Sequence, residues 1–131
     1  MADLKDLLQG ADWKTEKHVP FIDCQDKISK GQIFQVELSV GKQIAHPNTT
    51  EHHIKFIEAY FLAEGEKFPY HLGRFEFTTH GESVQGPNTS TIFSEPKVTA
   101  YFKTDKSGTI MAVSYCNIHG IWKSEKEIDV D

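Results

Sequence analysis

Apolar and polar side chains alternate strictly over residues 34–40. Phe34, Val36, Leu38 and Val40 are apolar, whereas the residues between them are polar. Successive side chains of a strand point to opposite faces, so this period of two predicts a strand with one buried face.

Residues 54–62 are apolar on both alternating sets and are rich in β-branched and aromatic side chains. Such a run fits a strand covered on both faces, but it also fits a short buried helix. The length of nine residues favours the strand.

Turn-forming residues separate further runs of the same kind. Between these turns we expect strands over residues 19–24, 73–79, 98–103 and 110–115, and a last strand near Ile128. About seven strands at this spacing, with no long amphipathic helix between them, predict an all-β fold of two sheets packed as a sandwich. The one helix expected is short and N-terminal, where Asp3 is able to cap a turn whose Leu4, Leu7 and Leu8 share a face.

The composition is that of an ordinary globular domain. Of 131 residues, 38% are hydrophobic and 25% are charged, which supports one core and therefore one domain over residues 1–131. No apolar run approaches the roughly 18 residues of a membrane span, and the N-terminus lacks the basic and apolar segments of a signal peptide. We therefore expect a cytoplasmic protein that is not inserted in a membrane.

The net charge limits the classes of binding partner, and the cysteine count limits the state of the thiols. The formal net charge of -5 disfavours nucleic acid and anionic membranes. Cys24 and Cys116 are the two cysteines, too few for a disulfide framework, so we expect free thiols or a metal ligand.

Metal-binding residue types gather in three turn-rich segments, residues 16–20, 46–53 and 116–122. The Cys-x-x-His spacing lets Cys116 and His119 reach one ion from a single tight turn. Taken alone, that pair fits a buried thiol beside an unrelated histidine better than it fits two ligands of one metal ion. Together with the histidines of the other two segments, it predicts a mixed imidazole and thiolate site. Zinc is the default metal for such donors, but five candidates exceed a closed tetrahedral site and favour iron.

The same segments carry a resemblance to a known family. Glu-Lys-His-Val-Pro at 16–20, His-Pro-Asn-Thr-Thr-Glu-His-His at 46–53 and Cys-Asn-Ile-His-Gly-Ile-Trp at 116–122 resemble superoxide reductases of the one-iron neelaredoxin type. Gly-Glu-Ser-Val-Gln-Gly-Pro-Asn-Thr-Ser at 81–90 extends the likeness over nearly the whole chain.

The resemblance implies an immunoglobulin-like, antiparallel β-sandwich that reduces superoxide to hydrogen peroxide at one non-haem iron per subunit. Its ligands would be four equatorial histidines and one axial thiolate, which correspond here to His18, His46, His52, His119 and Cys116. The rubredoxin-like centre of two-iron relatives needs four cysteines that this chain lacks. The resemblance also implies a rubredoxin-like electron donor and a homo-oligomer, with a homotetramer in one-iron relatives.

Two charged residues next to the first histidine have catalytic roles in the family. By resemblance, Lys17 attracts superoxide and assists proton delivery, and Glu16 occupies the sixth position of oxidised iron. Neighbouring side chains of an extended segment point to opposite sides, so both can face the iron only in turn. We therefore expect a mobile loop there, although two ordinary solvated charges are the plainer interpretation.

Other candidates receive plainer interpretations. His53 should project away from the metal if His52 binds it. His71 and His80 fit ordinary packing or exposure, and Cys24 fits a buried apolar role. Trp122 fits either the core or a shield over the metal site, and the core is the simpler interpretation. For function, dismutation at the same iron is an alternative that the sequence does not separate from reduction. A zinc-stabilised or metal-free binding module is a third possibility.

Overall fold

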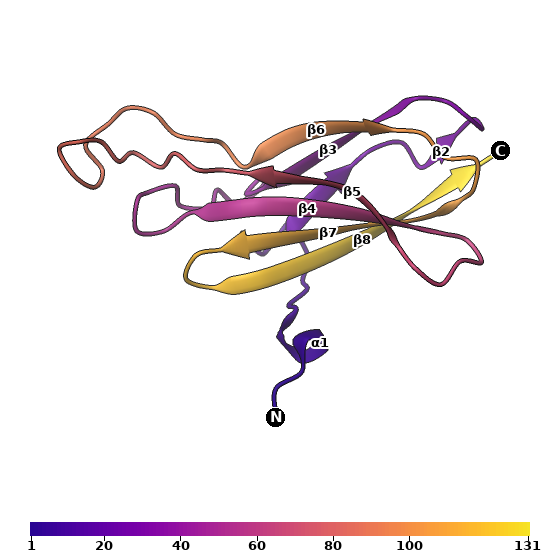
Figure 1. The fold of residues 1–131 in the computed structure, drawn as a ribbon, viewed down its shortest axis with the longest axis horizontal. Coiled ribbons are helices and arrows are strands. Elements are labelled where there is room, and N and C mark those ends of the chain that lie inside the picture. The colour runs from indigo at the N-terminus through magenta and orange to yellow at the C-terminus, as the bar shows by residue number, and fades with distance from the viewer.

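The computed structural model describes residues 1–131 as two β-sheets packed face to face, with one short helix outside them (Figure 1). The elements are α1 (Leu4–Leu7), β1 (Pro20–Asp23), β2 (Lys27–Ile28), β3 (Phe34–Val40), β4 (Ile54–Ala63), β5 (Tyr70–Glu76), β6 (Lys97–Phe102), β7 (Gly108–Cys116) and β8 (Gly120–Val130). No helix is long and apolar enough to cross a membrane.

The two sheets contain three and five strands. The smaller sheet has the order β1-β3-β6 and the larger has the order β2-β8-β7-β4-β5. The predicted two-sheet sandwich is therefore confirmed. All strand pairs are antiparallel except β2 with β8, which pair in parallel over two residues. About seven strands were predicted and eight are present. The additional strand is β2, whose two residues are too few to give a periodic signal.

The core lies between the sheets and follows the predicted patterns. Strand β3 buries Phe34, Val36, Leu38 and Val40, as its alternation predicts. Strand β4 confirms the strand interpretation of its apolar run, because one alternating set is buried in the core. Its other set is half-buried on the outer face of the larger sheet, where Phe56 stacks on a tyrosine of β7.

Some strand limits differ from those expected. Strand β5 starts at Tyr70 and ends at Glu76, so it lies three residues earlier than predicted. Strand β8 covers 11 residues, whereas only its end near Ile128 was expected. Charged residues such as Lys123 and Glu125 interrupt the apolar pattern of β8, because one of its faces is partly open to solvent.

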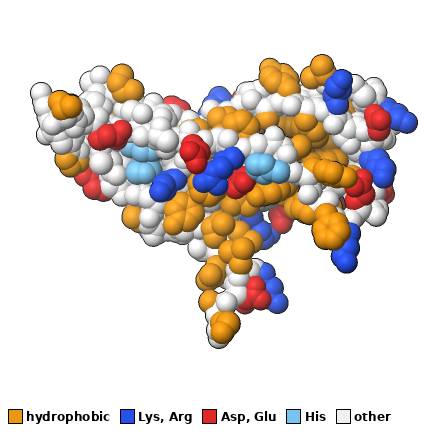
Figure 2. All heavy atoms as spheres, viewed as in Figure 1, with side chains coloured by type: hydrophobic (Ala, Val, Ile, Leu, Met, Phe, Trp, Pro, Cys, Tyr) orange, Lys and Arg blue, Asp and Glu red, His pale blue; other side chains and the backbone are white.

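The N-terminal helix is confirmed, but most of its apolar face is exposed, and only Leu8 is half-buried. The Asp3 carboxylate accepts a hydrogen bond from the Lys5 amide, as expected of a cap. Leu4 and Leu7 remain 62% and 52% exposed. Figure 1 shows α1 standing away from the sandwich, and Figure 2 shows apolar side chains on this projecting arm. The arm joins the body at Gln9, which exchanges backbone hydrogen bonds with residues 121 and 123 at the start of β8.

Candidate metal centre

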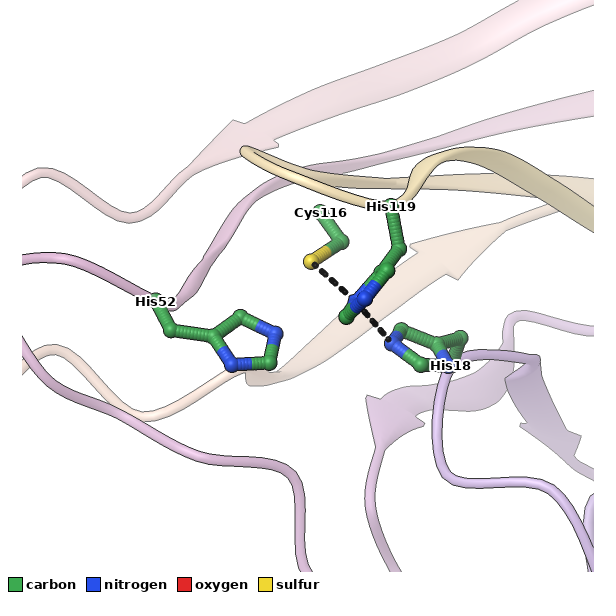
Figure 3. Close-up of side chains that lie close together, drawn as sticks. All are labelled: His18, His52, Cys116 and His119. Carbon is green, nitrogen blue, oxygen red and sulfur yellow. Dashed lines mark hydrogen bonds between the residues drawn. The ribbon is translucent and has the colours of Figure 1, made fainter.

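Strand pairing brings the three histidine-bearing segments to one end of the sandwich. His18 precedes β1, His52 precedes β4, and Cys116 and His119 flank the turn from β7 to β8. Cys116 pairs with Ile54 on one side and Gly120 on the other. This register places the end of the segment that carries His52 beside the Cys-x-x-His turn, where the Asn117 side chain bonds to the backbone of Glu51 and His53. The donor atoms of His18, His52, Cys116 and His119 all lie within 4.8 Å of one another (Figure 3).

The ring of His46 completes a nearly square arrangement of four imidazoles. Neighbouring ring centroids are 4.8 Å apart for His18 and His46, 4.7 Å for His46 and His52, 5.0 Å for His52 and His119, and 4.8 Å for His119 and His18. Each ring is steeply inclined to its neighbours, whereas His18 and His52, across the diagonal, are 6.4 Å apart and closer to parallel. The histidines thus surround one common centre.

In two of these rings, a hydrogen bond from one nitrogen leaves the other nitrogen able to bind a metal ion. The Nδ1–H of His18 donates to Glu16 Oε1 at 2.6 Å, and the Nδ1–H of His46 donates to the Pro47 carbonyl at 2.7 Å. A neutral imidazole that donates from one nitrogen has a lone pair on the other. Nε2 of His18 and of His46 is therefore available to a metal ion.

Two of the histidines have a buried nitrogen without any hydrogen-bond partner. These atoms are His46 Nε2 and His52 Nε2. Buried polar atoms almost always have a partner, because losing water without replacement costs free energy. A metal ion at the centre of the four rings would supply that partner, so the residues present fit a bound cation.

The sulfur of Cys116 lies beside the same centre. Cys116 is fully buried, and its Sγ is 3.8 Å from His119 Nδ1, which is itself 3.1 Å from His18 Nε2. Two nitrogens bound at right angles to one ion would lie about 3 Å apart, given metal–nitrogen bonds of about 2.1 Å. The distance between the His18 and His119 nitrogens therefore fits two ligands of one ion. The donor set of imidazoles and one thiolate suits zinc or iron better than magnesium or calcium.

Burial and nearby positive charge favour the neutral form of two of the histidines, His46 and His52. Burial lowers the pKa of His46 to about 4, and burial together with neighbouring imidazoles lowers the pKa of His52. The positive charge of Lys17 acts in the same direction on both residues. Neutral imidazoles are the form that binds metal, so protons do not compete for these two sites near neutral pH.

Comparison with known proteins agrees with this geometry. Residues 10–125 match the family model described as Desulfoferrodoxin. The chain belongs to the desulfoferrodoxin family. It is 52% identical to the superoxide reductase of Pyrococcus furiosus, over 96% of this chain and 99% of that protein. It is also 52% identical to the neelaredoxin of Megalodesulfovibrio gigas, over 94% of this chain and 95% of that protein.

Solved structures in the family have the same fold. The reduced superoxide reductase (neelaredoxin) of Archaeoglobus fulgidus superimposes with a TM-score of 0.87 and 54% identity, covering 94% of this chain and 98% of that one. The resemblance noted in the sequence motifs is therefore confirmed at the level of the family and of the β-sandwich fold.

Two further residues hold the imidazole of His18 or its backbone. The indole of Trp122 stacks on the His18 ring at 4.8 Å and 13°, and its Nε1–H donates to the His119 carbonyl at 3.2 Å. The buried Ser114 hydroxyl donates to the His18 carbonyl at 2.7 Å. Trp122 is buried, as predicted, and it also lies against the site. The contact of Ser114 was not predicted, since a serine in an apolar strand gives no signal of its partner.

The two charged residues next to His18 occupy different places. Glu16 accepts from both the Nδ1–H and the backbone N–H of His18, at 2.6 and 2.9 Å. Although burial opposes it, these hydrogen bonds hold the pKa of Glu16 below its usual value. Glu16 thus contacts the outer nitrogen of His18 in this structure, and its role at the sixth iron position remains a prediction. Lys17 is half-buried, and its ammonium group makes no ion pair.

The remaining histidines and Cys24 lie outside the donor cluster. His53 stacks on His80 with ring centroids 3.5 Å apart, and its Nδ1–H donates to the Thr49 carbonyl. His71 is exposed and pairs with Glu58. Cys24 is half-buried against the core.

Proposed function

We propose that this protein is a superoxide reductase whose iron is held by His18, His46, His52, His119 and Cys116. The observation that carries the proposal is the convergence of four imidazoles and one thiol on a single centre, with two inward nitrogens that have no other partner. Membership of the desulfoferrodoxin family supports the same reaction. When bound, iron would supply the ferrous–ferric couple that gives superoxide one electron, with two protons taken up to release hydrogen peroxide.

The protein residues orient the ligands and tune their basicity. Glu16, by accepting the Nδ1–H of His18, fixes its tautomer and makes Nε2 a stronger donor. Trp122 and Ser114 hold the ring and the backbone of the same residue. Cys116 would contribute an anionic sulfur from a site with no exposed surface, which strengthens its electrostatic influence.

Anaerobic reduction followed by a superoxide pulse tests the function. One peroxide formed per superoxide, with oxidation of the iron, is the expected result. One peroxide per two superoxides, with oxygen released, would instead establish dismutation. Stoichiometric zinc without visible colour would replace the proposal by a zinc-stabilised binding module.

Lys17 supplies local positive charge that a protein of net charge -5 otherwise lacks. Its charge acts on the imidazoles of His46 and His52, so it lies near the proposed path of an anionic substrate. We expect Lys17→Ala to slow the second-order reaction with superoxide by about tenfold at low salt and to weaken its dependence on ionic strength. Stopped-flow kinetics at several salt concentrations measure both effects.

Lys14→Ala is the matched control for this variant. It removes the same charge three residues earlier, from an exposed side chain, and should leave the rate near the wild-type value. Iron content should be unchanged in both variants. Equal rates and equal salt dependence for wild type and Lys17→Ala would disprove steering by this lysine.

Each turnover consumes one electron, so a one-electron carrier must restore the reduced site. We propose a rubredoxin-like protein as donor and the cytoplasm as the place of reaction, with residues 1–131 acting as one iron-binding domain.

The projecting N-terminal arm supports a further proposal, that the protein is a homo-oligomer, with a homotetramer the form expected from the family. A helix of four residues is not stable in water by itself, and exposed leucines favour a covering surface. We expect the double variant Leu4→Asp, Leu7→Asp to reduce the molar mass measured by light scattering, with iron content unchanged. Lys5→Asp is the control on the same helix, and an equal mass for all three proteins would contradict a role of this arm.

A further inference from the structure

The segment that carries two proposed ligands has no regular structure of its own. Residues 46–53 connect β3 to β4 outside every strand, yet they place His46 and His52 at the metal centre. A second irregular loop, residues 77–96 between β5 and β6, lies against this segment. Contacts from that loop therefore contribute to the position of the two histidines.

Asn88 makes the densest set of these contacts. Its Oδ1 accepts the backbone N–H of Thr50 at 2.9 Å, and its own backbone N–H donates to Thr50 Oγ1 at 3.1 Å. Its Nδ2 group donates to both carboxylate oxygens of Glu51, at 2.8 and 2.7 Å. All the polar groups of the Asn88 side chain are thus directed at the two residues immediately before His52.

A second group of contacts extends from the same loop to the other end of the segment. The Asn48 amide donates to the Ser94 carbonyl at 3.0 Å, and its oxygen lies 2.9 Å from His80 Nδ1. The His80 ring also stacks on His53, and the backbone carbonyl of His80 accepts a hydrogen bond from the Thr50 hydroxyl at 3.0 Å. The segment is thus held on both sides of His52 and two residues after His46.

The backbone conformation of Asn88 indicates that the asparagine side chain is required at this position, because glycine would adopt the same conformation more easily. It is the one non-glycine residue with positive φ, at 55°. That conformation is disfavoured for any residue with a Cβ atom, and glycine would adopt it without strain. Asparagine tolerates it better than most residues, and here it adds three hydrogen bonds that glycine would lose.

We propose that Asn88 is a positioning residue of the metal centre. It fixes Thr50 and Glu51 so that His52 Nε2 is already directed at the centre before a metal binds. This inference rests on the proposed function, since it assumes that His52 is a ligand. Removing a group that hydrogen-bonds directly to a metal ligand typically changes metal affinity by about 10–100-fold. Because Asn88 acts through the two residues before His52, we expect an effect near the lower end of that range.

The test compares Asn88→Gly with Val84→Ala in the iron-loaded protein. Asn88→Gly keeps the backbone conformation accessible and deletes only the side-chain contacts, whereas Val84 is fully exposed in the same loop and makes no such contacts. We expect Asn88→Gly to release iron to a ferrous chelator about tenfold faster and to shift the visible thiolate-to-iron band. Val84→Ala should match the wild type in both measurements.

A rescue experiment separates positioning from general loss of structure. Asn88→Asp should weaken iron retention further, because the new carboxylate faces that of Glu51. Adding Glu51→Gln removes the repulsion and restores a donor, so the double variant should recover most of the wild-type release rate. Failure of this recovery, or wild-type iron release in Asn88→Gly, would overturn the inference. A wild-type protein that binds no iron at these histidines would instead overturn the proposed function.

Discussion

Replacing Cys116 by serine is expected to abolish the visible thiolate-to-iron band and to reduce the rate of superoxide reduction by at least about 100-fold. A serine hydroxyl remains protonated where a thiol ionises on metal binding, and it is a harder and weaker ligand. Absorption spectra, iron analysis and stopped-flow kinetics on the purified variant provide the measurements. The loss should appear even in molecules that retain iron.

Cys24→Ser is the matched control. Cys24 is the other free thiol of the chain, half-buried and outside the donor cluster. This variant should keep the spectrum and the rate of the wild type. If Cys116→Ser keeps them as well, Cys116 is not a ligand and the last histidine-bearing motif has been misassigned.

The adjacent residues His52 and His53 should respond very differently to alanine substitution. The Nε2 atom of His52 is buried at the centre without a partner, whereas the ring of His53 stacks on His80 and bonds to the Thr49 carbonyl. We expect His52→Ala to lower the affinity for iron by at least about tenfold. His53→Ala should bind close to one iron per chain, as measured by metal analysis after dialysis.

The pair serves as its own control, because both variants remove an imidazole from the same segment. The opposite result would mean that the segment entering β4 is displaced by one residue. Such a displacement turns every following side chain to the other face of the sheet, which the buried Ile57 and Ala59 make unfavourable.

The fold could be predicted where one face of a strand is buried and the other is wet. Strand β3 shows this alternation from Phe34 to Val40, and only Ser39 of its polar set is also buried. Strand β8 was predicted only near Ile128, because its partly exposed face carries charged residues that break the pattern. The parallel pairing of Ile28 with Val130 joins distant parts of the chain, and no local pattern encodes it.

The proposed ligands could be named from motifs, whereas their supporting contacts could not. Cys116 and His119 belong to one turn, so their proximity follows from spacing alone. The hydrogen bond from Ser114 to the His18 carbonyl spans 96 positions of sequence and depends on how the two sheets pack. The contact of Glu16 with His18 is local, but it depends on a side-chain rotamer that a motif does not specify.

The candidate metal centre joins two parts of the molecule that differ in how strongly hydrogen bonds hold them. Cys116 ends a nine-residue strand that is hydrogen-bonded on both edges, so its amide should exchange with solvent only when the whole sandwich opens. Residues 46–53 have no such ladder and are held mainly by side-chain contacts from residues 77–96, so they should open at a lower free-energy cost than the strands. We therefore expect iron to enter and leave the folded molecule through fluctuations of this one segment, so that iron can be lost without unfolding of the sandwich.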